Sequence, residues 1–138
     1  MIGILVVAHG TLAESLVEGV SHILGHHPPS LTTLDFSAHA DPDEWQHLLR
    51  ARITGLDQGQ GVLVMADVYG ATPCNTLCRV LVPAHVEGVT GVNLPMLLNA
   101  LNYRDTLPLP QLLERIVNGG RNSINHISET MCNAAKGN

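Results

Sequence analysis

The chain has 138 residues, of which 45% are hydrophobic but only 3% aromatic, and its formal net charge is −5. This length suits one domain with a single aliphatic core, and the scattered basic residues exclude the basic stripe that nucleic-acid binding requires. No apolar run approaches the ~20 residues of a membrane-spanning helix, and the N-terminus lacks the features of a signal peptide. We therefore expect a cytoplasmic protein with neither nucleic-acid binding nor membrane insertion.

An apolar run at residues 2–8 opens the chain and ends at His9. Its β-branched residues predict a strand that is buried on both faces. Gly10 and Thr11 follow as a turn residue and a candidate helix N-cap, and residues 12–24 have the apolar spacing of a helix. The sequence thus predicts His9 at the C-terminal end of a buried strand, immediately before a helix.

The same order of elements returns in the middle of the chain. Residues 31–36 predict a second, more exposed strand, and Asp41 is the predicted N-cap of a helix over 42–56. Residues 62–66 form another fully apolar strand, which ends at Asp67. A Gly-Ala-Thr-Pro loop then leads to a helix that we expect to begin at Thr72 or Pro73, with Thr72 as its N-cap, and to end near residue 81.

The C-terminal part predicts a fourth strand at 85–92, helices at 95–102 and 111–118, and a last short strand at 123–127. Gly119 and Gly120 are expected to close the second of these helices, and residues 128–138 to form a disordered tail. One short segment between strand and helix either lines a pocket or forms a structural turn: Asn93, Leu94, Pro95 and Met96.

Alternating strands and helices predict an α/β fold with three layers, α/β/α, around a mainly parallel sheet. The C-terminal strand would be a short edge strand, antiparallel or exchanged with another subunit. The strands at 2–8 and 62–66 are the most apolar, so we expect them to be the central pair. His9 and Asp67 then emerge side by side at the edge where parallel sheets bind ligands.

A carboxylate beside an imidazole fixes its tautomer, leaves the other ring nitrogen free as a nucleophile, and stabilises the ring when it becomes positively charged. The two loops add backbone N–H groups and hydroxyls at helix N-termini, which are features of phosphate sites. The candidate phosphate-binding residues are Gly10, Thr11, Gly70, Ala71 and Thr72. Together these features predict a phosphohistidine site at His9, supported by Asp67.

Other chemistries fit the sequence less well. One His and one Asp are too few for a metal site, and no second His lies three or four residues from His9. The chain has no Gly-x-Ser-x-Gly elbow and no nucleotide-binding glycine motif. A small hydrolase or a metal-binding protein that uses His9 and Asp67 remains an alternative.

Three motifs in order, Val-Ala-His-Gly-Thr-Leu, Met-Ala-Asp-Val-Tyr-Gly-Ala-Thr-Pro and Gly-Val-Asn-Leu-Pro-Met, resemble the IIA domain of the mannose family of the phosphoenolpyruvate-dependent sugar phosphotransferase system. The resemblance covers residues 1–127. It implies an α/β sandwich and a homodimer whose last strand is a candidate for exchange. It also implies a histidine that the carrier protein HPr phosphorylates and a IIB partner dephosphorylates, with no metal and no cofactor.

Carried over by motif, His9 is the phosphorylated histidine, Asp67 its carboxylate partner, and Thr72 a phosphate contact. The family usually has Gly-Gly-Ser-Pro where this chain has Gly-Ala-Thr-Pro, so a hydroxyl is retained at Thr72 while Ala71 replaces a glycine. Ala66 stands where Ser or Thr commonly precedes the aspartate. The change at Ala71 would tighten the loop or alter a partner contact.

The resulting hypothesis is a phosphoryl relay from HPr through His9 to a IIB component, with peripheral association to a IIC/IID permease as a further implication. We expect no IIB module after residue 127. This favours, as an alternative, a stand-alone regulatory IIA protein that reports its phosphorylation state to a target protein without sugar transport.

Overall fold

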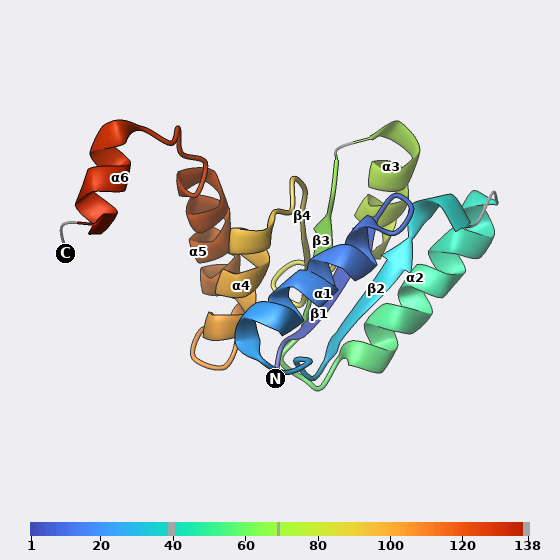
Figure 1. Ribbon diagram of the computed structural model, residues 1–138. Helices are drawn as coiled ribbons and strands as arrows, with labels where there is room; N and C mark the ends of the chain where they lie inside the picture. The colour runs from blue at the N-terminus through green and yellow to red at the C-terminus, as the bar shows by residue number, and fades with distance from the viewer. Residues whose placement is uncertain (39–40, 69, 137–138) are drawn as a thin grey trace.

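The computed structural model describes residues 1–38, 41–68 and 70–136, with the side chains at 38, 71–74 and 135–136 left out. The fold is a four-stranded, fully parallel sheet covered by helices on both faces (Figure 1). Its elements in chain order are β1 (Gly3–Ala8), α1 (Leu12–Leu24), β2 (Leu31–Asp35), a short 3-10 helix η1 (Phe36–Ala38), α2 (Pro42–Leu56), β3 (Val62–Ala66), α3 (Ala71–Val80), β4 (Val86–Val89), α4 (Leu94–Tyr103), α5 (Leu109–Asn122) and α6 (Glu129–Lys136).

The strand order β2-β1-β3-β4 confirms the predicted α/β class and makes the two most apolar strands the central pair. Every residue of β1 and β3 is buried, whereas β2, at one edge, is buried at only two of its five positions. Two apolar layers pack against the faces of the sheet. One contains α1, α4 and α5, and the other contains α2 and α3.

Local signals set the first two long helices where the sequence predicts them, at Leu12–Leu24 and Pro42–Leu56. The carboxylate of Asp41 accepts the N–H of Asp43 at 3.0 Å, so Asp41 is the N-cap of α2. Thr11 occupies the N-cap position of α1 but makes no side-chain capping bond. The end of α4 is joined to the starts of β1 and β2 by the buried Arg104, which donates to the carbonyls of Ile2, Pro29 and Ser30.

The helix α5 is longer than predicted, because Gly119 and Gly120 lie inside it and do not end it. A Cβ on Gly120 would lie 2.8 Å from Cε of Met96, and a Cβ on Gly119 would lie 2.7 Å from Nδ2 of Asn99. The two glycines therefore permit close packing of α5 against α4, and are not a stop signal. The fourth strand is shorter than predicted and covers Val86–Val89.

The C-terminal segment also differs from the sequence expectation. Residues 124–128 follow the end of α5 at Ser123, and they pair with no strand in the part of the chain that the structure describes. Residues 129–136, expected to be disordered, form α6, which begins where Ser128 accepts the N–H of Met131 at 3.2 Å. In Figure 1, α6 stands apart from the sheet and its covering helices.

Candidate functional site

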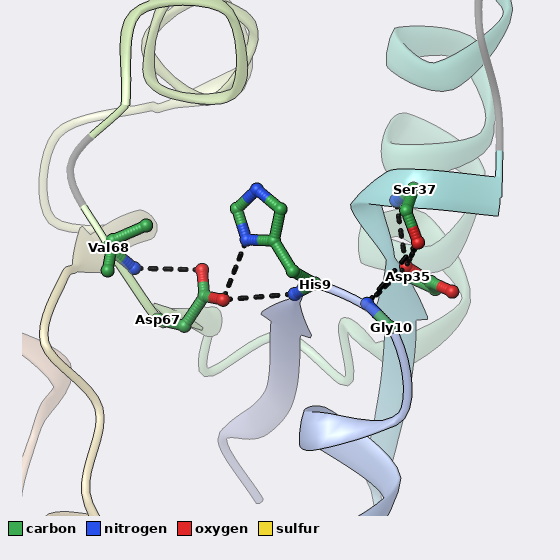
Figure 2. A network of polar contacts seen from close by, with 6 residues as sticks. All are labelled: His9, Gly10, Asp35, Ser37, Asp67 and Val68. Carbon is green, nitrogen blue, oxygen red and sulfur yellow. Dashed lines mark hydrogen bonds and ion pairs between the residues drawn. The ribbon is translucent and has the colours of Figure 1, made fainter.

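His9 follows the last residue of β1, at the C-terminal edge of the sheet, and its side chain is 52% exposed. Nδ1 of its ring lies 2.8 Å from Oδ2 of Asp67, and the same oxygen accepts the backbone N–H of His9 at 2.9 Å (Figure 2). The predicted adjacency of the two residues is therefore present. It arises because β1 and β3 are parallel neighbours in a register that puts Val7 opposite Ala66, so the residues that follow the two strands meet at the same edge.

The backbone of Asp67 is fixed by hydrogen bonds through both its N–H and its carbonyl group. Its N–H donates to the carbonyl of Val7 at 3.1 Å, and its own carbonyl accepts the N–H of Gly91 at 3.0 Å. The second carboxylate oxygen, Oδ1, accepts the N–H of Val68 at 2.8 Å. The carboxylate is therefore fixed in place, and only 9% of the side chain is exposed.

Two opposing influences act on the pKa of Asp67. Burial is the largest and raises the pKa, but the hydrogen bonds from the His9 ring, the His9 N–H and the Val68 N–H together outweigh it. The pKa lies below its ordinary value as a result, so Asp67 is ionised at neutral pH. An ionised carboxylate at Nδ1 selects the tautomer with hydrogen on Nδ1, leaving a lone pair on Nε2. Nε2 lies at the edge of the ring that faces away from Asp67 (Figure 2).

A second carboxylate reaches the same turn from the other side. Oδ1 of Asp35, the last residue of β2, accepts the N–H of Gly10 at 3.0 Å, and Oγ of Ser37 lies 3.3 Å from the same N–H (Figure 2). Ser37 also donates both its N–H and its hydroxyl to Oδ1 of Asp35, each at 2.7 Å. The sequence analysis gives Asp35 no role in the site and does not predict that Ser37 contacts Gly10, although Asp35 is a polar residue at a strand end, as Asp67 is.

The pKa of Asp35 is lowered, chiefly by the hydroxyl of Ser37 and then by the Ser37 N–H. Between these polar residues, Phe36 places its ring centroid 5.3 Å from that of His9. Phe36 in turn packs on Trp45 at 4.5 Å. The chain's single Phe and single Trp therefore form a stack that ends at His9.

The predicted phosphate-binding residues lie at the starts of two helices, α1 and α3. Gly10 adopts a left-handed conformation with φ of 62°, and its N–H is already bonded to Asp35 and Ser37. Thr11 is exposed at the start of α1. Gly70, not Thr72, is the N-cap residue of α3, which corrects the predicted capping role of Thr72. Ala71 and Thr72 lie in the first turn of that helix, and their side chains are outside the described residues.

The segment predicted either to line a pocket or to form a turn has a structural role in the fold. Asn93 is the N-cap of α4, where it accepts the N–H of Met96 at 2.9 Å, and its amide donates to the carbonyl of Gly120. Met96 is buried in the core beside α5. Leu94 and Pro95 are the first two residues of α4.

A pocket of about 290 Å³ lies beside the His9–Gly10 turn, on the β2 side. It is lined by Gly10, Thr11, Ala13, Glu14, Thr33, Leu34, Asp35, Leu48 and Arg52, a set that does not include the His9 ring. Within the described residues, no group of three His, Cys, Asp or Glu side chains is arranged to hold a metal ion. None of the described helices is both long and apolar enough to cross a membrane.

Comparison with known proteins gives consistent results. Residues 3–117 match the EIIA-man family, described as the fructose IIA component of the phosphotransferase system. The chain is 31% identical over 125 residues to the mannose-specific EIIAB component of Escherichia coli K12. That alignment covers 89% of this chain but only 38% of that protein.

A second relative, the fructose-specific EIIA component of Bacillus subtilis, is 26% identical over 117 residues, covering 84% of this chain and 80% of that protein. Among solved structures, a phosphotransferase system EIIA component from Streptococcus agalactiae superposes with a TM-score of 0.80 at 22% identity. It covers 91% of this chain and 97% of its own, and this likeness supports the shared fold.

Proposed function

The chain belongs to the fructose and mannose IIA family of the sugar phosphotransferase system, and from that premise we propose that it relays a phosphoryl group through His9. The donor is the phosphohistidine of HPr, and the acceptor is a IIB component. The observation that carries the proposal is the contact between Nδ1 of His9 and the ionised Asp67, which leaves Nε2 as the nucleophile.

In the proposed transfer, the lone pair of Nε2 attacks the phosphorus of the donor phosphohistidine. A new N–P bond forms on His9 while the donor N–P bond breaks, and its electron pair returns to the donor imidazole. His9 gains positive character in this step, which the Asp67 carboxylate stabilises through the Nδ1 hydrogen. The reverse sequence of bond changes passes the phosphoryl group to the acceptor, so catalysis consists of positioning and charge stabilisation.

The helix ends near His9 support an anionic group there. Both α1 and α3 begin just after strands whose C-terminal ends carry His9 and Asp67, so their N-terminal N–H groups and positive dipole ends lie at this edge of the sheet. The hydroxyls of Thr11 and Thr72 are proposed phosphate contacts, together with the N–H groups of Gly70 and Ala71. The N–H of Gly10 would become a phosphate donor only by leaving Asp35.

The exposure of His9 suits a protein partner. Its ring is half exposed. Two apolar side chains close to His9 and Asp67 in the chain are also exposed: Leu12, the first residue of α1, at 45%, and Val68, which follows Asp67, at 57%. A surface that combines a reactive group with exposed apolar side chains is typical of docking sites for other proteins. We propose that HPr and the IIB component bind this surface one after the other. We also propose that the protein acts in the cytoplasm and associates peripherally with a IIC/IID permease.

We also propose a homodimer formed through the C-terminal segment. Ile124 and Ile127 are 80% and 76% exposed, and Met131 on α6 is 47% exposed. Large apolar side chains on a segment that stands apart from the core would be covered by a second subunit. Exchange of residues 123–127 between subunits would supply the strand partner that the segment lacks within one chain.

The experiment is intact-mass spectrometry after incubation with enzyme I, HPr and phosphoenolpyruvate. We expect one acid-labile phosphoryl group on the wild type, none on His9→Ala, and one on His85→Ala, the matched variant of another histidine that contacts an aspartate. A phosphoryl group retained on His9→Ala would reject His9 as the relay residue. No transfer to a folded wild type, while HPr is itself phosphorylated, would reject the relay and favour the hydrolase alternative.

A further inference from the structure

Three consecutive residues at the end of β2, Asp35, Phe36 and Ser37, all contact the turn that carries His9. Asp35 and Ser37 accept the N–H of Gly10, and the Phe36 ring lies against the imidazole. These residues are more than 20 positions away from His9 in the chain. The contacts therefore depend on the parallel pairing of β2 with β1, in which Ala8 lies opposite Asp35.

The turn is consequently held from both neighbouring strands. Asp67 accepts the N–H of His9 from the β3 side, and Asp35 accepts the next N–H, that of Gly10, from the β2 side (Figure 2). Two consecutive peptide groups are thereby fixed by two carboxylates. Hydrogen bonds to an ionised acceptor are roughly twice as strong as neutral ones, so a charged Asp35 is a firm anchor for the peptide between His9 and Gly10.

Gly10 is the point where the chain needs such an anchor. Its φ of +62° lies in the left-handed region, and an added Cβ would meet no atom within 4 Å, so packing does not fix this residue. Glycine has more conformational freedom than any other residue. The bond from Gly10 to Asp35 limits that freedom directly after the reactive histidine.

We propose that Asp35 is a positioning residue for His9, with Ser37 orienting the carboxylate and Phe36 limiting rotation of the imidazole. Asp35 acts through the N–H of Gly10, and no hydrogen bond found among the described residues joins its carboxylate to the imidazole. By fixing the turn, it keeps Nδ1 of His9 on Asp67 and Nε2 directed outward. This inference rests on the proposed relay function for its kinetic consequence, but its structural consequence is measurable in the resting protein.

A purely local role for the same residues makes a different prediction. The bond from the Ser37 N–H to Asp35, two residues earlier, is an Asx-turn that ends β2 and begins η1. If that turn were the only role of Asp35, its loss would lower stability and leave the state of the His9 ring unchanged. The two roles are therefore separated by a measurement on His9 itself.

The experiment compares wild type with Asp35→Ala, Asp35→Asn, Ser37→Ala and Ser37→Thr, and uses Glu114→Gln as a control that makes the same charge change as Asp35→Asn at an exposed position of α5. The first readout is the nitrogen-15 NMR spectrum of the His9 imidazole and the Gly10 amide, in the absence of any donor. The second is the single-turnover rate of phosphoryl acceptance at several concentrations of phosphorylated HPr. Its maximum and its half-saturating concentration serve as kcat and KM.

For Asp35→Ala we expect the Gly10 amide proton to move upfield and the imidazole nitrogens to move toward the shifts of a mixture of tautomers. Its kcat should fall about tenfold, with KM changed less than about threefold, as for loss of orientation without loss of docking. Ser37→Ala should show the same changes to a smaller degree, and Ser37→Thr should restore them. Asp35→Asn, which retains an acceptor oxygen, should lie between Asp35→Ala and the wild type.

Three results for Asp35→Ala would each overturn the proposal. They are imidazole shifts equal to those of the wild type, a kcat within twofold of the wild-type value, and a loss confined to KM. If Asp35→Ala does not fold, Asp35→Asn and Ser37→Ala decide by the same criteria. If the wild type accepts no phosphoryl group at all, the relay function fails, and the NMR readout alone then decides whether Asp35 positions His9.

Discussion

His9 and His85 each contact an aspartate, with 2.8 Å between Nδ1 of His9 and Asp67 and 2.6 Å between Nε2 of His85 and Asp57. The two pairs lie at opposite ends of the parallel sheet. His9 follows β1 and precedes the N-terminus of α1, whereas Asp57 is the residue after the C-terminus of α2 and His85 directly precedes β4. The surroundings of the two pairs therefore have opposite electrostatic character.

At the His9 pair, helix N-termini favour an anion. Nδ1 of His9 contacts Asp67, and Nε2 is left to act as the nucleophile. At the His85 pair, the outer nitrogen is bonded to Asp57, which also accepts the N–H of Gly59 at 2.9 Å. The carbonyl of His85 accepts the N–H of Val62, so this residue is part of the start of the sheet. A short contact between histidine and aspartate is thus compatible with either role, and its place in the fold distinguishes the two.

The largest expected difference between the pairs is in the rate of transfer. Asp67→Asn removes the charge that selects the His9 tautomer, so we expect phosphoryl acceptance to slow by about 100-fold or more. Asp57→Asn should leave the rate within about twofold of the wild type. Rapid-quench mixing with phosphorylated HPr, followed by intact-mass analysis, measures both rates. Equal losses in the two variants would contradict the functional distinction between the pairs.

The next largest difference is in stability, at the glycines beside the two pairs. Gly61 has a φ of +97°, and a Cβ there would lie 2.4 Å from the His85 carbonyl oxygen, whereas a Cβ on Gly10 would have open space. Gly10→Ala should therefore cost only the ~1–2 kcal/mol of a left-handed alanine. Gly61→Ala adds a backbone overlap, so we expect about 3 kcal/mol or more in total. Urea unfolding of both variants checks this order, which a similar loss in both would refute.

A smaller effect is expected when the second histidine is removed. His85→Ala should lower the thermal unfolding midpoint slightly, because the side chains of this pair are 43% and 28% exposed and exposed ion pairs contribute little. Calorimetry measures the midpoint, with His126→Ala, an exposed histidine after α5, as the matched control. If the unfolding midpoint of His85→Ala is no lower than that of the control, the His85–Asp57 pair does not stabilise the fold.

Much of the fold follows from local signals. The apolar runs at 2–8 and 62–66 and the Asp41 cap lie within single elements, so sequence patterns locate β1, β3 and α2, and the adjacency of His9 and Asp67 follows from parallel pairing. The sequence predicts an end to α5 that is too early, because Gly119 and Gly120 permit packing against α4, a tertiary contact that overrides their local tendency to end a helix.

The missed part of the site has a similar cause. Asp35 and Ser37 reach Gly10 only because β2 is the other neighbour of β1, and nothing in the weakly alternating residues 31–36 indicates that order. One signal was available, since Asp35 is a polar residue at a strand end, like His9 and Asp67. The capping role predicted for Thr72 is wrong because α3 begins at Ala71, so its N-cap is Gly70, two residues before Thr72.

The smallest expected effect is the pH dependence of stability, where the two pairs should behave alike. The pKa of Asp67 and that of Asp57 both lie below the ordinary value of 3.8. Each ionised carboxylate therefore contributes stability that is fully present above the ordinary value and is lost as the pH falls through the lower folded-state pKa.

The free-energy difference between wild type and Asp67→Asn should thus be constant above about pH 5 and shrink as the pH falls from about 4 toward 2, and Asp57→Asn should follow the same course. Urea unfolding at several pH values measures both curves. A difference that grows in acid would mean that the aspartate concerned has a raised pKa, and for Asp67 that burial outweighs its hydrogen bonds. If both curves fall together while only Asp67→Asn slows transfer, the pairs share their electrostatic contribution to folding, and the special property of His9 is its place beside the helix N-termini.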